Sequence, residues 1–222
     1  MTVLFVIATI IIFLTIDWII QRRKQPVPQT AVATRKPAET FAVRLPEGIF
    51  FAPSHTWLNL FPSGKIRIGV DDFISGLLAH PEITLLKQPG EEVRRGDPII
   101  LLKEKDHLLT IRSPIEGHIL TANDELPKNP KLLKEQLFSD GWAYMIKPLK
   151  LKEVKHMLIG DETRTWIQHE FHRLRDLLAG LGRNGSLQPA YLQEGGPPIA
   201  GVLNVMDDVV WQQIDQEFLR VQ

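Results

Sequence analysis

The hydrophobic residues at the N-terminus form one almost uninterrupted run. From Thr2 to Ile20 the chain is apolar except for threonines and Asp17. A helix of this length crosses a hydrocarbon core of about 30 Å, because each residue adds about 1.5 Å. Asp17 lies about one turn from the end of the run, beside Trp18, so we expect it at the level of the lipid headgroups. The pattern predicts a transmembrane anchor at residues 1–21.

Basic residues flank this run on one side only. Arg22, Arg23 and Lys24 follow it directly, whereas only Met1 precedes it. Because positively charged flanks stay on the cytoplasmic side of a membrane, we expect the rest of the chain to be cytoplasmic. The alternative is a cleaved export signal, since Ala31–Ala33 resembles a cleavage site. The position of the charges and the length of the run argue against that alternative.

The middle of the chain changes from an extended tether to a β-rich block. Residues 22–47 contain four prolines and no helical period, which predicts a flexible tether. In residues 48–149 short apolar runs alternate with Gly- or Pro-containing turn signals. These signals begin at Pro62, Gln88, Arg94, Ser113 and Ser139. The spacing predicts a small antiparallel sandwich or barrel.

Residues 150–222 show helical periodicity instead. One apolar row consists of Ile167, Phe171, Leu174, Leu178 and Leu181, and a second of Met206, Val210, Ile214 and Phe218 with Trp211 and Val221 beside it. The pattern favours Asp161 as the cap of the first helix, and Gly180 and Gly182 as its stop. Each apolar face must be buried against the β block, the other helix or another protein. We predict partner binding by Ile167, Phe171, Leu174, Leu178, Met206, Val210, Trp211 and Ile214, with docking on the β block as the alternative.

Composition excludes several classes of function. The chain has 222 residues, with 26 basic and 26 acidic side chains, so a polyanion such as nucleic acid is not expected as the main partner. It contains no cysteine, which excludes disulfides, thiolate metal sites and a cysteine nucleophile.

Two groups of polar residues are candidates for a chemical site. Asp106 and His107, with His118 further along, could form an acid–base pair, but neighbouring strand residues point to opposite faces and no nucleophile accompanies them. His169 and His172 are three apart on the predicted helix, without the HExxH pattern or a third ligand nearby. We expect a solvated turn and surface histidines, and no metal.

Four further residues are assigned to the framework. Asp71 and Asp72 follow a predicted strand, which favours a turn or a helix cap over a cation site. Trp57 and Trp142 are expected to fill the core, because a tryptophan side chain buries a large area.

A set of short motifs runs through the β block in a fixed order. They are HTW at His55, IGVDDF at Ile68, PGEEVRRGDP at Pro89, SPIEGHI at Ser113, NDEL at Asn123, NPKLL at Asn129 and DGWAYMIKP at Asp140. Each motif is weak alone, but their order and spacing resemble the H protein of the glycine cleavage system, a lipoyl carrier that shuttles an aminomethyl group between enzymes. The resemblance covers about Ser54–Pro148. It implies a mainly β, flattened lipoyl-domain-like fold, a barrel-sandwich hybrid, here with an N-terminal transmembrane helix and two C-terminal helices.

The resemblance also implies where the cofactor would be attached. In the family a lysine at a hairpin tip carries lipoic acid through an amide. That position lies ten residues after Gly96 and seven before Ser113, which is Asp106 in this chain. A carboxylate cannot form the amide, so we expect no cofactor. Lys105 and Lys103 are the fallback sites for a lipoyl group, although in a strand Lys105 would face away from Asp106.

Two functions follow from these patterns. The first is a non-catalytic, membrane-anchored accessory or scaffold subunit of a larger membrane protein complex, whose partners are the membrane and other protein subunits. The second is a membrane-tethered lipoyl carrier, modified at Lys105 or Lys103, that passes acyl, aminomethyl or redox groups to a partner enzyme. The sequence gives little support to a hydrolase or a metalloenzyme.

Overall fold

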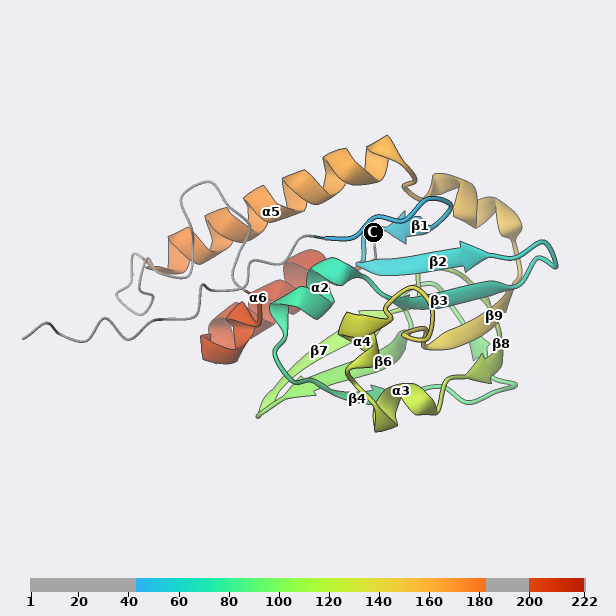
Figure 1. Cartoon of the computed structure of the whole chain (residues 1–222), viewed down its shortest axis with the longest axis horizontal. Helices are drawn as coiled ribbons and strands as arrows, with labels where there is room; N and C mark the ends of the chain where they lie inside the picture. Colours follow the sequence, from blue (N-terminus) through green and yellow to red (C-terminus); the bar gives the residue numbers. More distant parts are fainter. Residues whose placement is uncertain (1–42, 183–199, 222) are drawn as a thin grey trace, which may run out of the picture. The chain divides into compact units, whose positions relative to one another are not determined.

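The chain folds around two antiparallel β-sheets (Figure 1). The computed structural model describes residues 43–182 and 200–221, with side chains up to residue 180 in the first range. One sheet has six strands in the order β1-β2-β3-β9-β8-β5, and the other has three in the order β4-β6-β7. The strands are β1 (Phe50–Ala52), β2 (Thr56–Leu60), β3 (Ile66–Val70), β4 (Glu82–Leu85), β5 (Glu92–Val93), β6 (Pro98–Glu104), β7 (His107–Arg112), β8 (Gly117–Ala122) and β9 (Tyr144–Pro148).

The predicted membrane anchor at residues 1–21 lies outside the described residues. Within the described ranges, no helix combines the length and the apolar character that a membrane crossing requires. The end of the predicted tether is described from Val43 onward, and its Leu45 packs against the core. Arg44 binds the Asp72 carboxylate through its backbone N–H at 2.8 Å and its guanidinium at 2.8 and 3.0 Å. The last residues of the predicted tether are therefore part of the folded body.

The alternation of apolar and polar residues builds the core between the sheets. In β3, the side chains of Ile66, Ile68 and Val70 are buried. The guanidinium of Arg67 lies over the rings of Phe61 and Trp142 on the other face. The prediction of a mainly β fold from this alternation is confirmed.

Trp57 on β2 is fully buried, as predicted. Its indole lies over Gly69 of the neighbouring strand, where a Cβ would come within 2.8 Å of the ring. A glycine opposite Trp57 is therefore required by the close approach of the ring to the backbone. Trp142, which was also predicted to fill the core, is only half-buried.

Short helices connect the strands. In α2 (Asp72–Leu77) the Asp71 side chain accepts a hydrogen bond from the Ile74 N–H at 3.0 Å, which confirms its predicted role as a helix cap. The other short segments are α3 (Glu125–Lys128), α4 (Leu132–Glu135), η1 (Leu151–His156) and η3 (Val202–Val205), where η denotes a 3₁₀ helix.

The two predicted C-terminal helices are present as α5 (Asp161–Gly182) and α6 (Asp208–Phe218). Figure 1 shows α5 running along the β1 and β2 side of the body and α6 beside α2 and β7. The prediction that their apolar rows bind a partner is wrong. These side chains pack against the chain's own core, because the β body leaves an apolar surface that both helices cover. Seven are buried and one, Phe171, is half-buried; they are Ile167, Phe171, Leu174, Leu178, Met206, Val210, Trp211 and Ile214.

Candidate functional site

The hairpin formed by β6 and β7 carries the position that the sequence analysis singled out. Glu104 pairs with His107, so Lys105 and Asp106 alone form the turn. Both side chains are exposed. Lys105 has a φ of 57°, in the left-handed region that two-residue hairpin turns need at their first position. Lys105 was expected to face away from Asp106 if both lay in a strand, but they lie in the turn, where strand alternation does not apply.

A buried carboxylate fixes the base of this tip. The Glu104 side chain is only 4% exposed, and it accepts hydrogen bonds from the N–H groups of Ala79 at 3.0 Å and His80 at 3.1 Å. These two residues follow α2. The tip is therefore held against the α2 end of the body, because breaking this contact would leave a buried carboxylate without donors.

The C-terminal segment Val202–Phe218, which we call the C-terminal clamp, lies against the hairpin. The Lys105 amine donates to the Asn204 carbonyl at 2.7 Å. The His107 ring stacks on Trp211 with centroids 4.9 Å apart, and its Nδ1 lies 2.9 Å from the Asp208 carboxylate. The clamp thus reaches the lysine at the apex and the residue after the turn.

The clamp also covers the outer edge of β7. This strand ends the three-stranded sheet, so its outward N–H groups have no neighbouring strand to bind. The Asp215 carboxylate of α6 accepts one of them, from Thr110, at 2.8 Å. Within the clamp, the Trp211 indole N–H donates to the Leu203 carbonyl at 3.0 Å. The hairpin and the clamp form one hydrogen-bonded unit.

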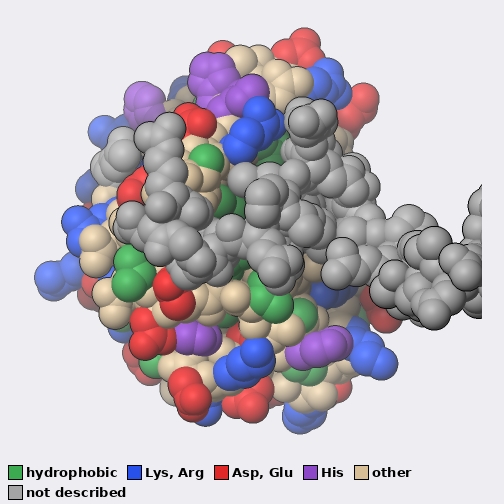
Figure 2. Space-filling model, turned by 90° about the vertical axis from the view of Figure 1, so that its left-hand side faces the viewer, with side chains coloured by type: hydrophobic (Ala, Val, Ile, Leu, Met, Phe, Trp, Pro, Cys, Tyr) green, Lys and Arg blue, Asp and Glu red, His purple; other side chains and the backbone are tan. Residues whose placement is uncertain are grey.

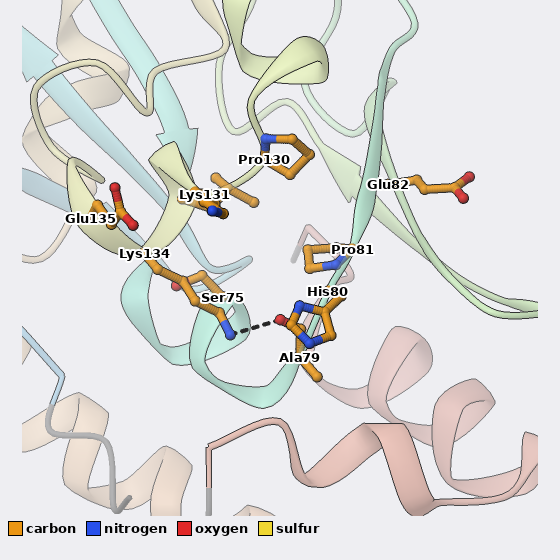
Figure 3. Close-up of a pocket in the computed structure, with 10 residues that line it drawn as sticks. Ser75, Ala79, His80, Pro81, Glu82, Pro130, Lys131, Lys134 and Glu135 are labelled. Atoms are coloured by element: carbon orange, nitrogen blue, oxygen red, sulfur yellow. Dashed lines mark hydrogen bonds between the residues drawn. The ribbon is translucent and has the colours of Figure 1, made fainter.

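A pocket of about 460 Å³ adjoins the base of the hairpin (Figure 3). It lies between α4 and the segment Ala79–Glu82. The Lys134 amine donates across it to the Ala79 carbonyl at 2.9 Å. The buried Ser75 hydroxyl donates to the Asp72 carbonyl at 3.3 Å and lies 3.5 Å from the Asp72 carboxylate, which Arg44 already binds.

A buried histidine ties the body to α5. His55 has no exposed surface, and its Nδ1 lies 2.7 Å from the Asp71 carboxylate. Its Nε2 lies 3.7 Å from the Glu170 carboxylate, too far for a hydrogen bond but close for two charges. The ring is stacked on Phe73 at 4.6 Å and tilted against Trp166 at 5.0 Å. Because the ring is completely enclosed, this cluster stabilises the fold and does not meet a substrate.

The charges of this cluster support one another. Burial would lower the pKa of His55, but the carboxylates of Asp71 and Glu170 outweigh burial and raise that pKa to about 9. Burial raises the pKa of Glu170, but His55 and Arg173 outweigh it, and the net effect is a lowered pKa. Arg173 contacts both Glu170 oxygens, at 2.7 and 2.9 Å. His55 is therefore an imidazolium at neutral pH.

The free energy of unfolding is expected to fall as the pH rises from 6.5 to above 9. The pKa of His55 is about 9 in the folded chain and 6.5 in the unfolded chain, where its contacts are absent. Its contribution to the free energy of unfolding is therefore complete below pH 6.5 and is lost as the pH rises past 9. The loss should be on the order of 3 kcal/mol. Chemical denaturation at pH 6 and pH 9.5 measures it, with His55→Gln as the control. An equal loss in that variant would contradict the assignment to His55.

Sequence reasoning missed this cluster. His55 was noted only as part of a motif and Asp71 only as a cap, while Glu170 stands unremarked between the two histidines of HEFH. Those histidines, His169 and His172, are exposed on α5. No local pattern links the three charged residues, because the fold brings them together from three separate elements.

The other residues singled out from the sequence are spread apart. Lys103 is exposed on β6, opposite Leu108 and away from the turn. His107 lies in the three-stranded sheet beside Asp208, whereas His118 lies in the six-stranded sheet, 3.8 Å from Glu92. His118 is therefore not part of one site with Asp106 and His107. In the described part of the chain, no group of three or more His, Cys, Asp or Glu side chains is placed to hold a metal ion.

Comparison with known proteins places this fold. A family model described as "Glycine cleavage H-protein" matches residues 49–170, more than half of the chain. The chain belongs to the glycine cleavage H-protein family. Its relatives include the glycine cleavage system H protein of Oceanobacillus iheyensis, 27% identical over 56% of this chain and 98% of that protein. The probable glycine cleavage system H protein of Thermococcus kodakarensis is 24% identical over 50% of this chain and 81% of that protein.

A solved H protein is also similar. The crystal structure of the glycine cleavage system H protein from Mycobacterium marinum covers 53% of this chain and 94% of its own, with 20% identity and a TM-score of 0.45. The match to the H-protein family model ends at residue 170, inside α5. The C-terminal clamp therefore lies outside the part of the chain that matches the H-protein family.

Proposed function

We propose that this H-protein family member is a non-catalytic, membrane-anchored accessory subunit of a larger membrane protein complex, in which the β body serves as a binding module and carries no lipoyl group. The predicted anchor at residues 1–21 and its basic flank support the membrane location. A chain can keep the fold of its family without the family's chemistry, because the chemistry depends on the residues of the site.

The single observation that carries the proposal is the engagement of the hairpin tip by the C-terminal clamp. A lipoyl arm needs a free lysine amine at a solvated apex that a ligase and partner enzymes can reach. Here the Lys105 amine is bound by the Asn204 carbonyl at 2.7 Å, and His107 is covered by Trp211. The second residue of the turn, Asp106, offers a carboxylate that cannot form an amide.

The alternative function is a lipoyl carrier modified at Lys105. It is favoured by one observation: Lys105 is an exposed lysine within the two-residue turn, in a chain of a lipoyl carrier family. On this reading the amine would have to leave Asn204 before it is acylated. Lys103 is a weaker candidate, because it lies in the strand and not in the turn.

Intact mass separates the two functions. When the full chain is co-expressed with a lipoate ligase and supplied with lipoate, we expect it to stay unmodified. The matched variants are Lys105→Arg and Lys103→Arg, with Asp106→Lys as a test of whether the ligase reads this apex. A lipoyl adduct on the wild-type chain that Lys105→Arg removes and Lys103→Arg retains would establish the carrier and overturn our proposal.

A further inference from the structure

One end of the six-stranded sheet gathers the loops of four strands. β2 ends there at Leu60 and β3 begins at Ile66, while Gly117 at the start of β8 pairs with Pro148 at the end of β9. Ile66 pairs with Ile146, which brings the two halves of this end together. We call the surface formed by residues 60–65, 94–95, 114–116 and 147–156 the basic end. Figure 1 shows the turn between β2 and β3 far from the tip of the β6–β7 hairpin.

Exposed leucines stand out on the basic end. Leu149 is 57% exposed, Leu151 50% and Leu60 38%, although the core of this body buries most of its large apolar side chains. Leu151 lies close to the β2–β3 turn, since its Cδ1 is 3.9 Å from the place of a Cβ on Gly64. Leu151 and the β2–β3 turn therefore belong to one surface.

Lysines alternate with these leucines. The segment Lys147–His156 reads KPLKLKEVKH, and all four of its lysines are exposed. The loops around it add three more exposed basic side chains, Lys65, Arg94 and Arg95. Because the whole chain has a formal net charge of zero, this concentration of positive charge is local.

The acidic residues of the basic end are already engaged. The Glu116 carboxylate lies 3.2 Å from the Lys150 amine, and the Glu153 carboxylate accepts the Glu116 N–H at 3.1 Å. They neutralise only part of the positive charge.

The face with the hairpin differs from the basic end. Figure 2 shows the left-hand side of Figure 1, and on this face acidic, basic and histidine side chains are interspersed.

We propose that the basic end is a peripheral contact surface for an anionic lipid bilayer, with Leu149 and Leu151 entering the headgroup boundary and the surrounding lysines binding lipid phosphates. Protein interfaces are depleted in lysine and enriched in aromatic residues and arginine, whereas lysines flanking exposed leucines are typical of membrane surfaces. This inference rests on the proposed membrane location. The roughly 20 residues between the predicted anchor and Val43 span at most about 70 Å, which lets the basic end reach the bilayer.

The absence of cysteine makes this surface directly testable. We would place a single polarity-sensitive fluorophore on Leu151→Cys in the full chain, reconstituted into vesicles of phosphatidylcholine alone or with phosphatidylglycerol. The matched control is Leu108→Cys beside the hairpin turn, which is 49% exposed. We expect a blue shift and quenching by brominated acyl chains at position 151 only in the anionic vesicles. The substitution Lys147→Glu with Lys152→Glu should weaken this contact roughly tenfold or more, as should high salt.

Equal emission at position 151 in both lipid mixtures, or equal quenching at positions 151 and 108, would overturn the inference and leave an acidic protein as the occupant of the surface. Resistance to alkaline carbonate extraction tests the anchor separately. Release by carbonate together with a salt-sensitive blue shift would contradict the anchor but support the basic end. Retention in carbonate without a blue shift would support the anchor and contradict the basic end.

Discussion

Replacing His55 with leucine is expected to lower the free energy of unfolding by about 3–5 kcal/mol. The substitution removes the cation between two carboxylates. Asp71 is fully buried and would be left in the interior without its cation, while Glu170, which is 5% exposed, would keep only Arg173. Leucine keeps much of the volume, which separates the electrostatic effect from the effect of a cavity. Urea denaturation near pH 7 measures the change.

Two comparisons make this prediction specific. His118→Leu removes a histidine whose Nε2 lies 3.8 Å from Glu92 on the surface, and we expect a change below about 1 kcal/mol. The double variant His55→Leu with Asp71→Asn should recover part of the lost stability, because it removes the buried carboxylate that His55→Leu leaves without a cation. A loss at His55 as small as that at His118 would contradict the role of the buried cluster.

Replacing Trp211 with alanine is expected to lower the free energy of unfolding by about 3–5 kcal/mol and to loosen the C-terminal clamp. The indole is 2% exposed, it donates to the Leu203 carbonyl, and it supports the His107 ring. Its loss leaves a cavity under the clamp. Chemical denaturation gives the stability, and hydrogen exchange at the Thr110 amide reports the clamp, because that N–H is bound by Asp215.

Val209→Ala provides the matched control on the same helix. Val209 is 52% exposed, so its truncation should change the stability by less than about 0.5 kcal/mol. We also expect acylating reagents to modify Lys105 faster in Trp211→Ala than in Val209→Ala, because the Asn204 carbonyl is no longer held in place. Unchanged exchange at Thr110 in Trp211→Ala would show that the clamp is held by other contacts.

The patterns of the chain predicted its two C-terminal helices and the class of its middle block. Steps of three and four residues located α5 and α6, while short apolar runs between turn signals indicated a β-rich block without fixing its individual strands. The same rows could not reveal what covers them. An apolar row such as that of Leu174 and Leu178 predicts that one face of the helix is buried. It does not distinguish burial against the chain's own body from burial against a partner.

The candidate site was predictable only in its local part. Turn signals and motif spacing located the hairpin between Gly96 and Ser113, yet they did not place Lys105 in the turn beside Asp106, because the register of a hairpin is set by the pairing of its strands. The contact between Lys105 and Asn204 joins residues 99 positions apart. No short-range pattern encodes a contact of this kind, which depends on where the last helix docks.

The bond between Asp215 and the Thr110 N–H has a consequence for self-association. A sheet edge with free N–H groups can accept a strand from a second copy of the chain. Here the helix α6 shields that edge along β7, while the opposite edge is β4, a strand of only four residues with a charged Glu82 at its start. A chain that loses the clamp would therefore pair with a second copy through β7 as its concentration rises.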